Sequence, residues 1–145
     1  MTEVIPDAEV VVVAWAKANT PLLALIGGRV ATRIPTENTE QVIASGFLRV
    51  RRIGGGRSET EAPLDTALMQ VDAYASRKNG QPDYAKASQI ARTFVAAAEA
   101  VRGVALASGH IYGFSRFSGP RDVDEPETGW ARFQTDCYVT FRRAD

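Results

Sequence analysis

Apolar residues recur at helical spacing near the start of the chain. The period passes through Val11, Ala14, Trp15 and Ala18. Pro6-Asp7 is a typical helix start, and segment 19–21, Asn-Thr-Pro, is a typical stop. The valine run at 10–13 favours a strand, because β-branched side chains suit extended backbone. Since the helical period continues past these valines, we predict a helix here, followed by a short apolar turn at 22–26.

A longer apolar stripe follows the turn-forming segment 79–83. Its members alternate by three and four positions: Tyr84, Ala87, Ala91, Phe94, Ala98 and Val101. Gly103 is a natural C-terminal stop for this stripe. The pattern predicts an amphipathic helix of roughly 20 residues, about 30 Å long.

Alternation of apolar and polar residues predicts strands elsewhere in the chain. The clearest case is Leu64–Ser76, where every second residue from Ala67 to Ala75 is apolar. The segment from Trp130 to Arg143 alternates in the same way. Such a period of two is typical of a sheet with one covered face. Weaker strand patterns occupy Arg29–Ile34, Gly46–Ile53 and His110–Phe117.

These elements follow one another in the order α-β-β-β-α-β-β. Strands joined mostly through hairpins, with two helices, predict a two-layer α+β fold: a mostly antiparallel sheet with both helices on one face. The 145 residues are expected to form a single domain, 1–145. Two polar connections interrupt the pattern. We expect a mobile loop at a hairpin tip at 54–63 and a polar loop at 118–129.

Composition and charge narrow the classes of function. Hydrophobic residues make up 45% of the chain and charged residues 23%, an ordinary globular balance. The 17 basic residues equal the 17 acidic ones, which argues against a strongly basic nucleic-acid binder or a cationic membrane surface. The single cysteine excludes an intrachain disulfide framework and a cysteine zinc site. With no signal peptide or long apolar run, we expect a soluble intracellular product.

Four features could carry chemistry, and each has a simpler interpretation. The run Gly54-Gly55-Gly56 lacks the lysine and hydroxyl of a phosphate loop, so a hairpin loop is favoured. His110 has no GxSxG nucleophile motif beside it and is expected to be a surface or strand residue. Cys137 falls on an apolar strand face and is expected in the core. The acidic loop residues do not match an EF-hand, which favours a solvated loop: Asp122, Asp124, Glu125 and Glu127. We therefore predict no catalytic, cofactor-binding or metal site.

The polar face of the predicted sheet is rich in arginine and tyrosine. It could be a solvated face with weak cross-strand ion pairs, each contributing about 0–1 kcal/mol. It could equally be a subunit interface or a surface lining a lumen, because arginine and tyrosine are enriched at interfaces. The residues expected on this face are Arg49, Arg51, Asp72, Tyr74, Arg132, Asp136, Tyr138 and Arg142.

Nearly the whole chain resembles a known family of structural proteins. The resemblance rests on an opening helix with Ala14-Trp15, on the segment 28–35 before the first strand, and on three strand motifs. Those motifs are Phe47-Leu48-Arg49-Val50-Arg51-Arg52-Ile53-Gly54-Gly55, Met69-Gln70-Val71-Asp72-Ala73-Tyr74 and Arg132-Phe133-Gln134-Thr135-Asp136-Cys137-Tyr138-Val139-Thr140-Phe141. In these features the chain is similar to the tail terminator (tail completion) proteins of long-tailed, siphovirus-type bacteriophages.

The resemblance implies a structural virion protein and not an enzyme. Such a subunit would form a homo-oligomeric, hexameric ring on the finished tail tube, stop tube polymerisation and offer a surface for head joining. Its partners would be other copies of itself, the tail tube protein and head connector or stopper proteins. DNA would pass only transiently through the lumen, and no cofactor or membrane is expected. The protein would be assembled in the host cytoplasm and reside at the tail-neck junction.

Two loops are the expected contact sites in this interpretation. The hairpin loop would order on the tube, with contacts from Gly55, Gly56, Arg57, Ser58, Glu59 and Glu61. The loop carrying Asp122, Asp124, Glu125 and Glu127 is a possible second interface. Two alternatives stay open: another head-tail neck protein, such as a stopper, or a small hydrolase or nucleotide-binding enzyme with a site around His110 or one of the two loops.

Overall fold

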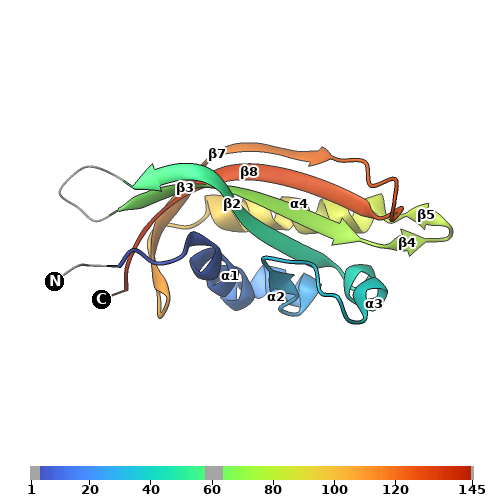
Figure 1. The fold of residues 1–145 in the computed structure, drawn as a ribbon, viewed down its shortest axis with the longest axis horizontal. Helices are drawn as coiled ribbons and strands as arrows, with labels where there is room; N and C mark the ends of the chain where they lie inside the picture. The colour runs from blue at the N-terminus through green and yellow to red at the C-terminus, as the bar shows by residue number, and fades with distance from the viewer. Residues whose placement is uncertain (1–3, 58–63, 145) are drawn as a thin grey trace.

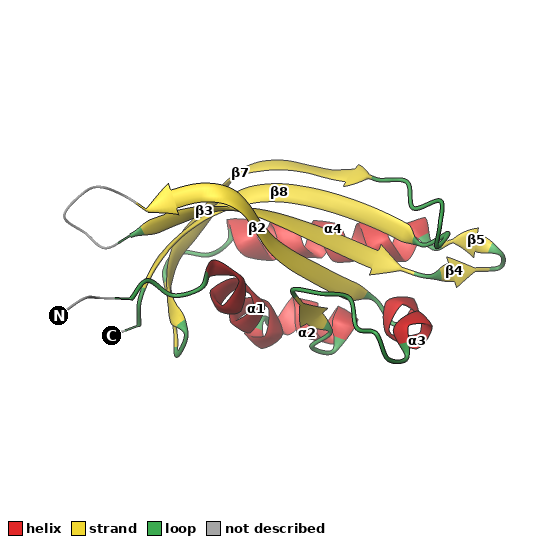
Figure 2. Ribbon diagram, in the orientation of Figure 1, coloured by secondary structure: helices red, strands yellow, loops and turns green. Residues whose placement is uncertain are grey.

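The fold is α+β, with a curled, mixed six-stranded sheet that three helices cover on one face, while a fourth, short helix lies over one end of the other face (Figures 1 and 2). This computed structural model describes residues 4–57 and 64–144. Four helices are described: α1 (Ala8–Ala18), α2 (Thr20–Ile26), α3 (Thr39–Ala44) and α4 (Tyr84–Glu99). The strands are β1 (Val30–Ala31), β2 (Phe47–Arg57), β3 (Asp65–Ala75), β4 (Arg77–Lys78), β5 (Gln81–Pro82), β6 (Val104–Leu106), β7 (Gly109–Asp122) and β8 (Ala131–Arg142).

The sheet order is β1-β2-β3-β8-β7-β6, so β8 lies in the middle although it follows every other strand in sequence. Strand β1 runs parallel to β2, and every other neighbouring pair in this sheet is antiparallel. The predicted class and the mostly antiparallel sheet are therefore confirmed. Strands β2 and β3 reach one end of the long axis, while α3 and the β4–β5 hairpin lie at the other (Figure 1).

The first helix forms where the period predicted it. The Asp7 side chain caps α1 by accepting a hydrogen bond from the backbone N–H of Glu9 at 2.8 Å. The expected apolar turn at 22–26 is wrong, because this segment lies within α2. Asn19 ends α1, and its side-chain oxygen also accepts the N–H of Leu22 at 3.2 Å, starting α2. An Asn-Thr-Pro sequence is thus both a stop and a start signal.

The core lies between the sheet and helices α1, α2 and α4. The alternate residues of β3 from Ala67 to Ala75 point into it and are fully buried, as predicted. Trp15 of α1 joins the two layers, with its ring centroid 5.8 Å from that of Phe94 and 4.9 Å from that of Phe114. These aromatic contacts fix α1 against α4 and β7.

Several element boundaries differ from the predictions. Strand β2 continues to Arg57, so the first part of the predicted 54–63 loop is strand, and its remainder lies outside the described residues. Strand β7 continues to Asp122, so the predicted 118–129 loop begins only at 123. The predicted order α-β-β-β-α-β-β omits α2, α3, β6 and the β4–β5 hairpin. These elements are short, and tertiary contacts rather than local periodicity stabilise them.

Among the described residues no single helix is long and apolar enough to cross a membrane. Helices α1 and α2 meet that criterion only as a pair, with a bend of 84° between them.

Candidate functional site

We call one side of the sheet the open face. It is the side of β2, β3, β8 and β7 that is turned away from α1, α2 and α4. Strand register places the predicted polar residues on it in rows. Arg49 pairs with Asp72, which pairs with Gln134 of β8. In the next row, Arg51 pairs with Gln70, which pairs with Asp136. Tyr74 and Arg132 form a third pair. The two-residue period therefore brought residues far apart in sequence onto one surface.

Asp72 is the centre of this surface and is completely buried. Its Oδ1 accepts hydrogen bonds from Arg132 Nε at 3.1 Å and Gln134 Nε2 at 3.2 Å. Its Oδ2 accepts one from Gln70 Nε2 at 3.2 Å and lies 3.8 Å from an Arg51 guanidinium nitrogen. A carboxylate without water needs such partners, because burial of an unpaired charge is very unfavourable. The expectation of a simple solvated face is wrong at this position.

Arg132 links this network to the predicted acidic loop. Its NH1 donates to Glu125 Oε1 at 2.9 Å while its Nε donates to Asp72. Burial alone would lower the pKa of Arg132, but hydrogen bonding and charge from Asp72 outweigh it and raise that pKa. Glu125 is therefore held inward. The other three carboxylates of the predicted loop are exposed: Asp122, Asp124 and Glu127.

Helix α3 and Trp130 cover the end of the open face near the start of β2. Ile43 of α3 packs with Phe47 and Tyr74 in a second, smaller core. Burial raises the pKa of the Tyr74 phenol. The Glu40 carboxylate accepts hydrogen bonds from Trp130 Nε1 at 2.8 Å and from Ser76 Oγ at 2.7 Å. These two hydrogen bonds lower the pKa of Glu40, and the bond from Trp130 makes the larger contribution.

Among residues 4–57 and 64–144, no helix lies over the opposite end of the open face (Figure 2). Its side chains are half-buried, and the hydroxyls of Thr66 and Thr140 lie 3.3 Å apart. The Arg116 guanidinium stacks over the ring of Tyr138 at 5.6 Å. Arg142, predicted on the same face, donates from Nε to the Tyr112 hydroxyl at 2.9 Å.

Two polar atoms in the Arg51–Gln70–Asp136 row have unused hydrogen-bonding capacity. Within the described part of the chain, Arg51 Nε and Asp136 Oδ1 are buried and have no hydrogen-bond partner. Asp136 Oδ2, by contrast, accepts a bond from Arg121 at 3.1 Å. Buried polar atoms are nearly always satisfied in stable structures. This row therefore offers a donor and an acceptor that the described subunit does not use.

The base of the β2–β3 hairpin is held by residues that the sequence reasoning missed. Both oxygens of buried Asp65 accept bonds from the Arg52 guanidinium, at 2.7 and 2.8 Å. The backbone N–H of Arg52 donates to Glu9 Oε2 of α1 at 3.0 Å. A signal was present: the period of two places Asp65 on the apolar side of its strand, where a carboxylate needs a cationic partner.

Glycine is required at one position of the predicted contact loop. Gly55 has φ +83°, and a Cβ there would lie 2.2 Å from the Thr66 carbonyl oxygen. Gly56 has nothing within 4 Å of the corresponding point. Of the predicted contact residues, Gly55, Gly56 and the backbone of Arg57 lie in β2, whereas Ser58, Glu59 and Glu61 lie outside the described residues.

The residues considered for catalysis have structural surroundings. The His110 ring packs edge-on against Tyr112, with 4.9 Å between centroids. Cys137 is buried, and burial raises the pKa of its thiol to about 12. No group of three or more His, Cys, Asp or Glu side chains within residues 4–57 and 64–144 could hold a metal ion.

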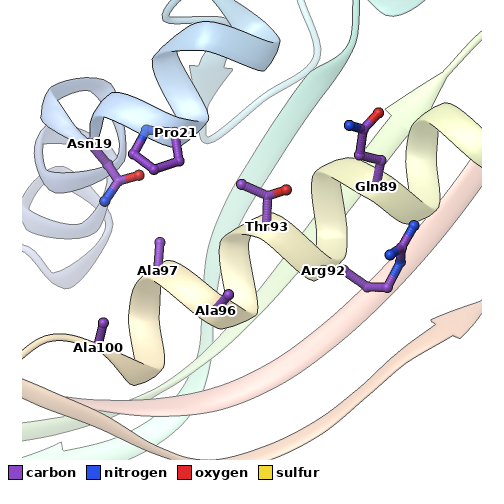
Figure 3. Close-up of a pocket in the computed structure, with 8 residues that line it drawn as sticks. All are labelled: Asn19, Pro21, Gln89, Arg92, Thr93, Ala96, Ala97 and Ala100. Carbon is purple, nitrogen blue, oxygen red and sulfur yellow. The ribbon is translucent and has the colours of Figure 1, made fainter.

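A groove of about 620 Å³ separates the start of α2 from α4. Figure 3 shows Asn19 and Pro21 on one side and α4 side chains on the other. Most of the α4 lining is small: Thr93, Ala96, Ala97 and Ala100. The groove carries one charged side chain, Arg92, whose Nε donates to Ser88 at 3.1 Å.

The described residues thus form a curled sheet with α1, α2 and α4 on one face and an arginine-rich open face on the other. Residues 4–144 match the model of a family described as "Phage tail termination protein". The chain therefore belongs to the phage tail termination family, as the sequence motifs suggested. The family is one of structural phage tail proteins, which makes the chain a virion component that interacts with other tail parts. No curated protein matches the chain.

Proposed function

We propose that this protein forms a ring, most simply a hexamer, that caps the completed phage tail tube. The ring ends tube polymerisation and gives head connector or stopper proteins a surface to join. Membership of the tail termination family carries this proposal. The open face supports it, because a buried charged network with uncovered polar neighbours is suited to contact with other subunits.

The open face would lie toward neighbouring subunits or the lumen in this ring. Three of its arginines are paired with carboxylates of the same chain: Arg51 with Asp72, Arg121 with Asp136, and Arg132 with Asp72 and Glu125. The net charge of zero fits a conduit that lets DNA pass without retaining it, since phosphate binding grows with the number of free cations. DNA contact would thus be transient.

The β2–β3 hairpin would contact the tail tube. Its base is rigid, because Arg52 is bonded at once to Asp65, to Gly54 and, through its backbone, to Glu9 of α1. The side chains proposed to contact the tube, Arg57, Ser58, Glu59 and Glu61, follow this base in the sequence. Gly55 and Gly56 would permit the local backbone geometry.

Deletion of residues 55–61 tests this function. We expect the variant to fold, because the core lies elsewhere, but to leave tails of uncontrolled length in electron micrographs of complemented phage. A loop of equal length made of glycine and serine is the matched control for side-chain contacts. Tails of normal length from the deletion variant would show that the hairpin is not the tube contact.

Binding to purified tails and to DNA-filled heads separates capping from another role in the neck. A tail terminator binds tail tubes without heads, whereas a stopper binds the portal side of filled heads. We expect binding to tubes. Binding to heads alone would make this chain a different neck component and overturn the capping proposal.

A further inference from the structure

Beside the face that it turns into the core, helix α1 carries a second stripe that is less buried, and Val13 of this stripe still packs partly against the core. The residues turned into the core are Ala8, Val11, Val12, Trp15 and Ala16. A second stripe follows the helical spacing i, i+3, i+4, i+7 and consists of Val10, Val13, Ala14 and Lys17. Val10 is 54% exposed. The four-valine run at 10–13 therefore contributes to the core and to this outer stripe, and a partner seated on the stripe would bury the exposed part of Val10.

This outer stripe forms one wall of a groove of about 380 Å³. The other wall is Val30, Ala31 and Thr32, in and just after β1. Strand β1 is the terminal strand of the sheet and has only two residues, so this margin is poorly covered. Lys17 lines the groove, and exposed Arg33 follows Thr32 in the chain. The lining of the groove is thus mostly apolar and includes one cation, Lys17.

A segment of opposite charge lies toward the other margin of the sheet. The turn 122–127 leaves β7, and its carboxylates Asp122, Asp124 and Glu127 are exposed. No hydrogen bond or ion pair within the described ranges holds these three side chains. The turn itself is anchored, because Glu125 is bonded to Arg132 and the N–H of Val123 donates to the Arg132 carbonyl at 2.9 Å. Val123 and Pro126 add apolar surface between the charges.

We propose that the α1–β1 groove of one copy receives the 122–127 turn of a second copy. The carboxylates of the turn would meet Lys17 and Arg33, while its apolar residues would cover Val10 and Val13. The two surfaces differ and lie toward opposite margins of the sheet, so each copy can donate and accept at once. Such a heterologous contact closes into a ring when its rotation allows. The inference rests on the proposed ring and names its contact.

Engineered cysteines test the contact directly, because native Cys137 is buried. Val13→Cys and Asp124→Cys are made as separate proteins, mixed and oxidised, both in solution and on tubes assembled from the tail tube protein. We expect a disulfide dimer in the mixture and none from either variant alone. The double variant should give a ladder of oligomers. The control pair, Val13→Cys with Ala105→Cys, uses an exposed residue of β6 and should not cross-link.

Charge reversal gives a second, independent readout. Lys17→Glu and Asp124→Lys should each weaken self-association roughly two- to fivefold, as expected for exposed charges at the rim of an interface. The two changes combined should restore much of it. Lys78→Glu, an exposed lysine of β4, is the matched control and should change nothing. Thermal melts establish that all variants are folded.

The possible outcomes distinguish failure of the proposed contact from failure of the proposed function. Cross-links within one single-cysteine variant, or equal cross-linking of the control pair, would overturn the proposed contact. The proposed contact would also be overturned if the copies associate and cap tubes while Val13→Cys and Asp124→Cys do not cross-link. That result would not contradict the capping function. Failure of the wild-type protein to self-associate or to bind tubes would instead contradict the proposed function.

Discussion

Strand β3 carries two buried carboxylates on opposite faces, and the structure stabilises them in different ways. Asp65 faces the helices and is bound by one arginine, Arg52, through two short hydrogen bonds. Asp72 faces the open side; it accepts hydrogen bonds from β3 and β8 and forms an ion pair with Arg51 of β2. The first carboxylate therefore fixes a local feature, the hairpin base, whereas the second ties strands together across the sheet.

The largest expected effect is the loss of folding stability when one of these two carboxylates is removed. Asp72→Ala should lower the free energy of unfolding by about 3 kcal/mol, because Arg132, whose side chain is only 17% exposed, loses its partner and three hydrogen bonds to the buried carboxylate are removed. Asp65→Ala should cost about half as much, since the Arg52 side chain is 31% exposed and can turn toward water. Urea unfolding at pH 7 measures both values. A greater loss of stability for Asp65→Ala than for Asp72→Ala would contradict the proposed difference between the two carboxylates.

A smaller effect is expected from backbone geometry at the hairpin base. Gly55→Ala should lower the free energy of unfolding by about 2 kcal/mol, because its φ is +83° and the new Cβ would press on the Thr66 carbonyl. Gly56→Ala is the matched control and should be nearly neutral. Hydrogen exchange of β3 amides would show whether the loss is confined to the hairpin. Equal stability of the two variants would contradict the requirement for glycine.

Thr135 is a buried polar residue that, unlike Asp72, lacks hydrogen-bond partners for its side chain within the described ranges. Its hydroxyl has no hydrogen-bond partner among the described residues, and the residue is 1% exposed. Thr135→Val keeps the shape and removes the unsatisfied group, so it should raise the free energy of unfolding by about 0.5–1 kcal/mol. Thr66→Val, which removes a contact with Thr140, is the control and should not stabilise. Thermal unfolding measures both.

The smallest expected effect is on the dependence of folding stability on pH in the acidic range. The pKa of Glu40 is lowered in the folded protein from 4.5, so the unfolded chain binds this proton more readily. Its contribution is present above pH 4.5 and is lost as the pH falls toward the lowered folded value. Trp130→Phe removes the largest cause of the shift and should flatten the dependence of stability on pH in this acidic window. An unchanged slope below pH 4.5 would show that the bond to Trp130 has no energetic role.

Periodicity predicted the main elements because long elements have one covered face. Helix α4 and strands β3 and β8 repeat apolar residues over many positions, so local pattern and tertiary structure agree. Helix α3 has six residues and no side-chain cap, and it depends on Ile43 packing against Phe47 and Tyr74. Such an element has no local signal strong enough to predict it.

The polar face was predicted as a set of residues, but its chemistry was not. Alternation placed Asp72, Arg132 and Arg51 on one side of the sheet. It could not indicate that Asp72 is completely buried, because that depends on register between strands and on side chains that fold over it. The role of Glu125 was missed for the same reason, since the turn brings it back to Arg132 only in three dimensions.

The place of β8 between β3 and β7 has a consequence for synthesis. The β1-β2-β3 half and the β7-β6 half of the sheet share no hydrogen-bonded border until residues 131–142 insert between them. A nascent chain that stops short of this strand has two open strand borders and no complete core. A chain that ends before residue 131 therefore lacks the strand that joins the two halves of the sheet, and we expect such truncated chains not to fold into a subunit able to assemble.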